Sequence, residues 1–218
     1  MQRVVLFIGI AWLFSCSPVR MVKPLEKGEQ ALGGNIGGPL IEFAGAPITI
    51  PYTSAFYAKG LSEKTTVFGS LHLTALSFGV FQTDIGLCQQ LWANHNKTLG
   101  LTANPAFHFA IDRWERNARF WPQLDIQLYK EFKNKQLIYA GVGNWIELKN
   151  TRPHNELQPQ FWFVSPQAGF KWGKNKWVYG FESKWLAPGV ANTPNIVDYI
   201  GINDKGALSL YFNLIKKF

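Results

Sequence analysis

Histidine, hydroxyl and carboxylate side chains recur at alternate positions in two separate stretches of this chain. Ser70, His72 and Thr74 lie in the first stretch, and His108 and Asp112 lie in the second. A histidine beside a carboxylate and a hydroxyl is the set of groups that acyl-transfer chemistry requires. These residues are therefore candidate catalytic groups. Polar side chains cut off from water also pair with one another for purely structural reasons, and we favour that second interpretation.

No cofactor or metal motif accompanies these candidates. The sequence contains no Walker loop, no zinc-type spacing of Cys and His, no Gly-x-Ser-x-Gly elbow and no dinucleotide fingerprint. We therefore expect no cofactor and no metal site, and the balance of the sequence is against an enzyme. Two further carboxylates, Asp125 and Glu182, fall on the same predicted face as the candidates.

The elements that must hold these side chains are strands, because apolar and polar residues alternate along most of the chain. A period of two places successive side chains on opposite faces of a strand. Residues 123–128 give the clearest case, with Leu124, Ile126 and Leu128 on one face and Gln123, Asp125 and Gln127 on the other. The candidate residues would share the polar face.

The alternation predicts about ten strands. They lie at residues 29–38, 52–59, 66–75, 78–90, 99–112, 119–132, 136–149, 160–172, 177–187 and 207–218. The links at residues 61–65, 92–98, 133–135 and 173–176 are short, whereas those at 39–51, 150–159 and 188–206 are long. Short turns at one end and long loops at the other are typical of transmembrane barrels. The tight link near Leu76, on the long-loop side, is the exception.

Periodicity alone does not say whether the apolar faces point inward or outward. Inward faces would form a soluble lipocalin-like barrel around a ligand, and outward faces would form a membrane barrel. The predicted strands are close to the about 9 to 11 residues that cross a bilayer. We therefore predict an all-β fold, a closed antiparallel up-and-down transmembrane β-barrel of about ten strands, with roughly eight to twelve allowed.

The N-terminus has the order of an export signal. Arg3 precedes an apolar run over residues 4–14, and Leu13-Phe14-Ser15-Cys16 resembles the lipobox read by lipoprotein signal peptidase. We predict a signal peptide at residues 1–15, a lipid-anchored tether at 16–28 that begins with lipidated Cys16, and the barrel at 29–218. Cys88, the second of two cysteines, is then left without a disulfide partner and is expected to be a buried small residue.

The chain ends inside a predicted strand, on an aromatic residue. Tyr211, Phe212 and the terminal Phe218 resemble the C-terminal signal by which the barrel-assembly machinery recognises outer-membrane barrels. That machinery is therefore an expected partner. Lys216, which falls on the apolar face of this strand, departs from the pattern.

Basic residues are spread over predicted turns instead of being concentrated on one face. The net charge is +8, from 22 Lys and Arg against 14 Asp and Glu. We therefore expect no nucleic-acid partner, and we expect the phosphates of outer-membrane lipids or lipopolysaccharide to be partners of the right sign. An aromatic girdle at the membrane surface is predicted from seven tryptophans: Trp114, Trp121, Trp145, Trp162, Trp172, Trp177 and Trp185.

The whole mature chain resembles the small lipidated outer-membrane β-barrel proteins of Bacteroidota-type bacteria. The lipobox, the Gly33-Gly34 and Gly37-Gly38 pairs and the Phe-ended last strand carry this resemblance. It implies localisation in the outer membrane, with anchoring through Cys16, and it transfers no catalytic residue. The leading functional hypothesis is a structural or interaction role in the cell envelope, including a protein partner bound through external loops. A small-solute pore, a lipid A-modifying enzyme and a tethered lipocalin-like lipid carrier are the alternatives.

Overall fold

The fold consists almost entirely of β-strands and is described by a computed structural model. It covers residues 18–114, 116–151, 157–158, 160–192 and 198–218. The predicted signal peptide and Cys16 lie outside these residues. The strands are β1 (Gln30–Phe43), β2 (Ala46–Thr49), β3 (Tyr52–Ser62), β4 (Thr65–His72), β5 (Val80–Ala93), β6 (Leu99–Asp112), β7 (Ala118–Glu131), β8 (Gln136–Ile146), β9 (Trp162–Lys174), β10 (Trp177–Ala191) and β11 (Lys205–Lys217). One short helix, α2 (Leu73–Ser77), joins β4 to β5.

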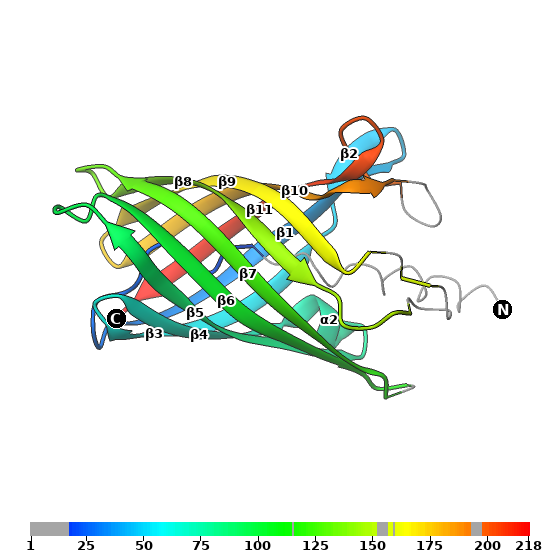
Figure 1. The fold of residues 1–218 in the computed structure, drawn as a ribbon, viewed down its shortest axis with the longest axis horizontal. Helices are drawn as coiled ribbons and strands as arrows, with labels where there is room; N and C mark the ends of the chain where they lie inside the picture. Colours follow the sequence, from blue (N-terminus) through cyan, green and yellow to red (C-terminus); the bar gives the residue numbers. More distant parts are fainter. Residues whose placement is uncertain (1–17, 115, 152–156, 159, 193–197) are drawn as a thin grey trace.

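The strands close into an antiparallel barrel (Figure 1). Each barrel strand pairs with the next one along the chain, and β11 pairs with β1 from Ala31↔Lys217 to Pro39↔Ser209. Among the described residues β2 pairs with the far part of β1 alone and stands outside the ring, so the closed barrel has ten strands. The predicted fold class is confirmed. β2 is an addition, because its residues were expected to be a loop.

Glycine permits the closing contact between the first and last strands. Gly37 of β1 has φ +137°, and a Cβ added to it would lie 2.1 Å from the carbonyl oxygen of Leu210 in β11. Any larger residue would therefore push the two strands apart. One of the glycine pairs noted in the sequence thus has a local structural reason.

The apolar faces point outward and the polar faces point into the lumen. Ile126 and Leu128 of β7 are 38% and 52% exposed, whereas Asp125 and Gln127 between them are 3% and 0% exposed. An apolar outer surface around a polar interior is the arrangement of an outer-membrane-type barrel. The lipocalin-like alternative needs apolar faces that point inward, so the structure contradicts it.

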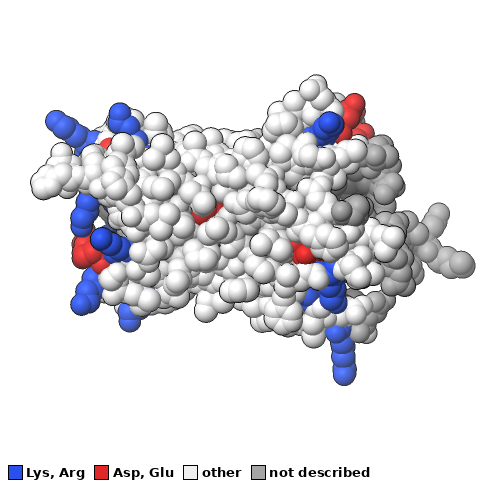
Figure 2. All heavy atoms as spheres, viewed as in Figure 1, with Lys and Arg blue, Asp and Glu red and all other residues white. Residues whose placement is uncertain are grey.

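The two ends of the barrel differ. The turn end carries the short connections at residues 63–64, 94–98, 132–135 and 175–176 together with the C-terminus, and the loop end carries α2 and the longer connections (Figure 1). In Figure 2 the Lys and Arg side chains gather at both ends, and the central band of the visible face is almost entirely uncharged. Over the described part of the chain no helix has the length and apolar character needed to cross a membrane.

The aromatic girdle is only partly as predicted. Trp162 and Trp177 are exposed on the outer surface, but Trp121 and Trp145 are 2% and 6% exposed, and their ring centroids lie 5.4 Å apart inside the barrel. The girdle assignment of Trp121 and Trp145 is therefore wrong. The physical reason is the alternation itself, which places both residues on inward-facing positions of β7 and β8.

Candidate functional site

The lumen is occupied by the chain's own N-terminal residues. Residues 18–28, called here the inner segment, precede β1, and their backbone passes the turn end where Gly28 N donates to the carbonyl oxygen of Gly60. Within this segment Val19, Arg20, Val22 and Leu25 are 4% exposed or less. Most of the described part of the predicted tether therefore lies inside the barrel, whereas residues 26–28 are exposed at the turn end.

Polar side chains on the barrel wall bind the backbone of the inner segment. The amide of Val19 donates to both carboxylate oxygens of Glu182 at 3.2 Å, and the amide of Leu25 donates to Thr66 Oγ1 at 2.8 Å. Three carbonyls of the segment accept bonds from wall residues: Arg20 O from Lys171 Nζ at 3.1 Å, Met21 O from Asn104 Nδ2 at 2.6 Å and Val22 O from Thr102 Oγ1 at 2.9 Å. Buried backbone groups require such partners, so these bonds fix the position of the segment.

Apolar contacts fill the remaining space. Met21 and Leu25 pack in one buried cluster that includes Phe56 and Cys88, and Val19 and Val22 pack in another that includes Tyr129. Gly60 on β3 leaves room for the segment, because a Cβ at this position would lie 2.0 Å from the carbonyl oxygen of Glu26. The full burial of Cys88 agrees with its expected role as a small core residue.

Arg20 of the inner segment is at the centre of a buried polar cluster on β1, β4 and β5. Its Nη1 donates to Asn35 Oδ1 at 2.7 Å, and its Nη2 donates to Ser70 Oγ and to Asp84 Oδ2, both at 3.0 Å. The Arg20 and Asp84 side chains are 3% and 1% exposed, so this is a fully buried ion pair. A buried charge is tolerated only where it is paired and hydrogen-bonded, as it is here.

Asp84 also joins three of the residues that the sequence singled out. Its Oδ2 accepts a hydrogen bond from Ser70 Oγ, lies 2.8 Å from His72 Nε2, and lies 3.9 Å from Nδ1 of His108. The register explains this convergence, because Asp84 is paired with Ser70 on one side and with His108 on the other. The structure therefore brings Ser70, His72 and His108 together.

Asp112, the fourth candidate, lies outside this cluster. Its two carboxylate oxygens accept the backbone amides of Trp114 and Asn117, each at 2.9 Å, so it stabilises the turn between β6 and β7. Thr74, on α2, bonds instead to Thr53.

Asp125 and Glu182 belong to another part of the lumen, where both approach Lys184. Lys184 Nζ is 3.9 Å from Asp125 Oδ2 and 3.6 Å from Glu182 Oε1.

Sequence reasoning missed Asp84, Asn35 and Arg20. Asp84 was detectable, because Gln82 and Asp84 occupy alternate inward positions of β5. Arg20 carried no such signal, since Asn35 and Asp84, which bind its side chain, lie 15 and 64 residues away in the chain.

The chemistry of this cluster differs from that of an activated nucleophile. The Ser70 hydroxyl donates to Asp84 and accepts from Arg20, and the side chain of His72 also turns to Asp84. A serine is activated when a neighbouring base accepts its proton, and here the histidines and the serine converge on the same carboxylate. The arrangement is suited to binding a cation, a role that the guanidinium of Arg20 fills.

Comparisons with known proteins give similarities of architecture only. No protein-family model matches the chain, and no curated protein matches it. The translocator domain of autotransporter NalP from Neisseria meningitidis matches with a TM-score of 0.48 and 9% identity, over 89% of this chain and 90% of that one. The outer membrane protein OprG from Pseudomonas aeruginosa matches with a TM-score of 0.33 and 11% identity, over 91% and 99%. Ail from Yersinia pestis matches with a TM-score of 0.30 and 10% identity, over 88% and 99%.

With TM-scores below 0.5, these similarities assign neither a site nor an activity to this chain. The class of protein follows from the geometry described above. It is a ten-stranded outer-membrane-type β-barrel with an occupied lumen.

Proposed function

We propose that this protein is a closed outer-membrane barrel with a structural or interaction role in the cell envelope. The observation that carries the proposal is the inner segment, which fills the lumen and is held there by wall residues on several strands. Ten strands enclose a lumen only somewhat wider than one that side chains fill. We therefore infer that the segment, in its bound position, blocks the passage of solutes. A small-solute pore is the second candidate only for a state in which the segment has left the lumen.

Conductance across planar bilayers tests this proposal. The protein should carry Cys16→Ala and a cleavable signal, so that no lipid acts on the inner segment. We expect no stable conductance from this protein and clear conductance after deletion of residues 18–27. Replacement of Lys27, the exposed lysine of the segment, by Ala is the matched control and should leave the barrel closed. Equal conductance with and without residues 18–27 would contradict the proposal.

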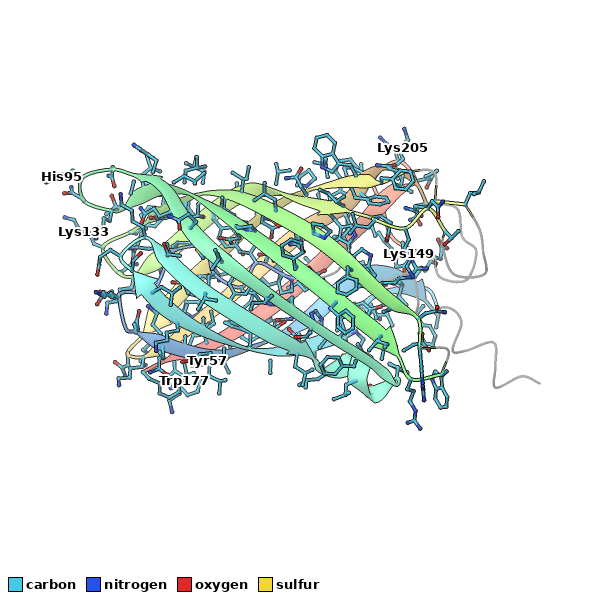
Figure 3. All side chains as sticks on the ribbon, turned by 60° about the horizontal axis from the view of Figure 1, so that its bottom comes forward. Tyr57, His95, Lys133, Lys149, Trp177 and Lys205 are labelled. Atoms are coloured by element: carbon cyan, nitrogen blue, oxygen red, sulfur yellow. The ribbon has the colours of Figure 1, made fainter. Side chains whose placement is uncertain are left out.

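The outer surface supports membrane insertion and contact with lipid phosphates. The apolar belt lies between two charged ends (Figure 2), and Figure 3 shows Lys133 at the turn end and Lys149 and Lys205 at the loop end. Cations at this depth attract anionic headgroups, including those of lipopolysaccharide. We propose that the end lysines bind these phosphates, and binding of phosphate lipids that survives neutralisation of these lysines would contradict the proposal.

Recognition by the barrel-assembly machinery is a further part of the proposal. Phe212 and Phe218 are 40% and 57% exposed on the outside of the barrel, where a receptor could reach them, whereas Tyr211 is 1% exposed inside it. Lys216 Nζ lies 5.4 Å from the centroids of the Trp177 and Phe218 rings, so its charge is placed among aromatic side chains at the turn end. Replacement of Phe218 by Ala should reduce the amount of folded barrel in the outer membrane.

Lipidation of Cys16 is proposed from the sequence, and the structure sets a condition on it. Three peptide units join Cys16 to Val19, a reach of at most about 11 Å. The inner segment runs from the turn end into the lumen, so its first residues lie inside the barrel. If the lipid on Cys16 is inserted in the leaflet at the turn end, these residues must move out of the lumen. Mass spectrometry of the N-terminal peptide tests the modification, and comparing the conductance of lipidated and Cys16→Ala protein tests the condition.

The loop end offers the surface for a protein partner. The β1–β2 hairpin extends beyond the barrel and is braced by residues 198–202, since Glu42 N donates to Asp198 O at 3.0 Å and Ile200 N donates to Leu40 O at 2.9 Å. Phe43 and Ile48 on this hairpin are 64% and 41% exposed. A photo-crosslinking residue at position 48 should therefore capture a protein partner, whereas one at lipid-facing position 126 should not.

A further inference from the structure

Three side chains on neighbouring strands form a set of metal-ligand atoms in the lumen. One ligand atom each of His72, Asp84 and His108 lies within 4.8 Å of the other two. Asp84 and His108 are 3% and 2% exposed, and β4, β5 and β6 hold the three residues through paired positions of one sheet. The framework around these atoms is therefore already built.

Two buried atoms of the cluster have no hydrogen-bond partner. They are Nδ1 of His108 and Oδ1 of Asp84. Buried polar atoms normally find a partner, and those that do not call for a specific explanation, such as an ion. Both atoms belong to residues of the ligand set, so hydrogen-bonding capacity is left unused on two of the three side chains that would hold a cation.

The donor chemistry selects a class of metal. Two imidazoles and one carboxylate suit zinc and other divalent transition metals, whereas calcium and magnesium require oxygen ligands almost exclusively. In a tetrahedral zinc site with bonds of about 2.0–2.1 Å, neighbouring ligand atoms are roughly 3.3 Å apart. The present atoms would reach that spacing through shifts of at most about 1.5 Å. One position would remain open to water or another ligand.

With the inner segment in the lumen, Arg20 supplies the positive charge beside Asp84. Its guanidinium is 3.0 Å from Asp84 Oδ2, so a divalent cation between Asp84 and the two histidines would be repelled at short range. We propose that His72, Asp84 and His108 form a binding site for a divalent transition metal of the zinc class, and that Arg20 of the inner segment competes with the metal for it. Departure of the inner segment opens the site, and metal binding in turn disfavours its return. This metal site does not depend on the proposed closure of the barrel to solutes, because metal binding and conductance are measured separately.

Cobalt(II) is the probe of choice, because its visible absorption bands report tetrahedral coordination by nitrogen and oxygen. The starting protein should be Cys16→Ala with Arg20→Gln, since glutamine removes the charge and keeps a hydrogen-bonding group toward Asn35 and Ser70. We expect one equivalent of Co²⁺ with tetrahedral bands, bound at least about a hundredfold more tightly than by the protein that retains Arg20. Unlabelled Zn²⁺ should displace it.

Matched variants assign the ligands. Adding His108→Asn to Arg20→Gln should abolish the bands, whereas adding His95→Asn should leave them, because His95 lies in the exposed turn at the opposite end of the barrel (Figure 3). Heat-modifiable migration on gels verifies that each variant is folded. If Arg20→Gln fails to fold, Arg20→Met provides the same test. Folded protein that lacks the Arg20 charge and binds no Co²⁺, or that binds it unchanged after His108→Asn, would overturn the proposal.

Discussion

Replacement of Arg20 by Ala should release the inner segment from the lumen. The guanidinium donates hydrogen bonds of 2.7–3.0 Å to Asn35, Ser70 and Asp84, and its contact with Asp84 is a fully buried ion pair. Removing one partner of such a pair leaves the other charge uncompensated in a poorly hydrated site. The substitution therefore destabilises the state in which the inner segment is bound in the lumen. It has much less effect on a state in which the segment has left and water has entered.

The expected magnitude follows from these contacts. Breaking a buried ion pair by removing one partner costs about 3–5 kcal/mol. Since about 1.4 kcal/mol corresponds to a factor of ten, the ratio of bound to released segment should fall by roughly 10²- to 4 × 10³-fold. The barrel itself should persist, because its strand pairing does not involve Arg20.

Thiol labelling measures this ratio. A cysteine introduced at Val22, which is 2% exposed, should react slowly with a water-soluble maleimide in Cys16→Ala protein and much faster when Arg20→Ala is added. Cys88 packs in a cluster with Met21 and Leu25 of the same segment, so it should be replaced by Ala in both proteins to leave position 22 as the labelled thiol. Lys27→Ala is the control and should leave the labelling rate unchanged. Equal rates with Arg20 and with Ala at position 20 would refute the reasoning.

Two further substitutions test the barrel itself. Gly37→Ala should lower the folded fraction seen by heat-modifiable migration, because its Cβ would meet the Leu210 carbonyl oxygen, and a fully folded variant would contradict the closure described here. Ile126→Lys places a charge on the lipid-facing side of β7 and should destabilise the barrel in vesicles by about 2–4 kcal/mol, measured by urea unfolding, whereas Lys130→Ala near the turn end should have little effect.

The strands could be predicted from sequence because each has an alternating pattern of its own. All ten predicted segments overlap a barrel strand, although the ends differ by several residues. β2 was not predictable in this way, since Ala46–Thr49 is too short to show a period. The period of two could not say whether the apolar face points inward, because it is the same in both cases, and the outward orientation was predicted from the strand lengths instead.

The site could be predicted only in part. Alternation placed Ser70, His72 and His108 on inward positions, and the strand register then brought them to Asp84. The same alternation also placed Asp112 among the candidates, and that assignment does not hold. Asp112 is the last residue of β6 and accepts hydrogen bonds from the adjoining turn. The position of residues 18–28 in the lumen depends on wall residues up to 163 positions away in the chain. A short segment with two prolines gives no local signal of such partners.

Hydrogen exchange of the inner segment tests the central claim most directly. In folded Cys16→Ala protein, the amides of Val19 and Leu25 donate to Glu182 and Thr66 and are buried, so the peptide that contains them should exchange as slowly as the barrel strands. Exchange of this peptide at the rate of an unstructured chain, in a barrel whose strands remain protected, would contradict a lumen closed by the inner segment.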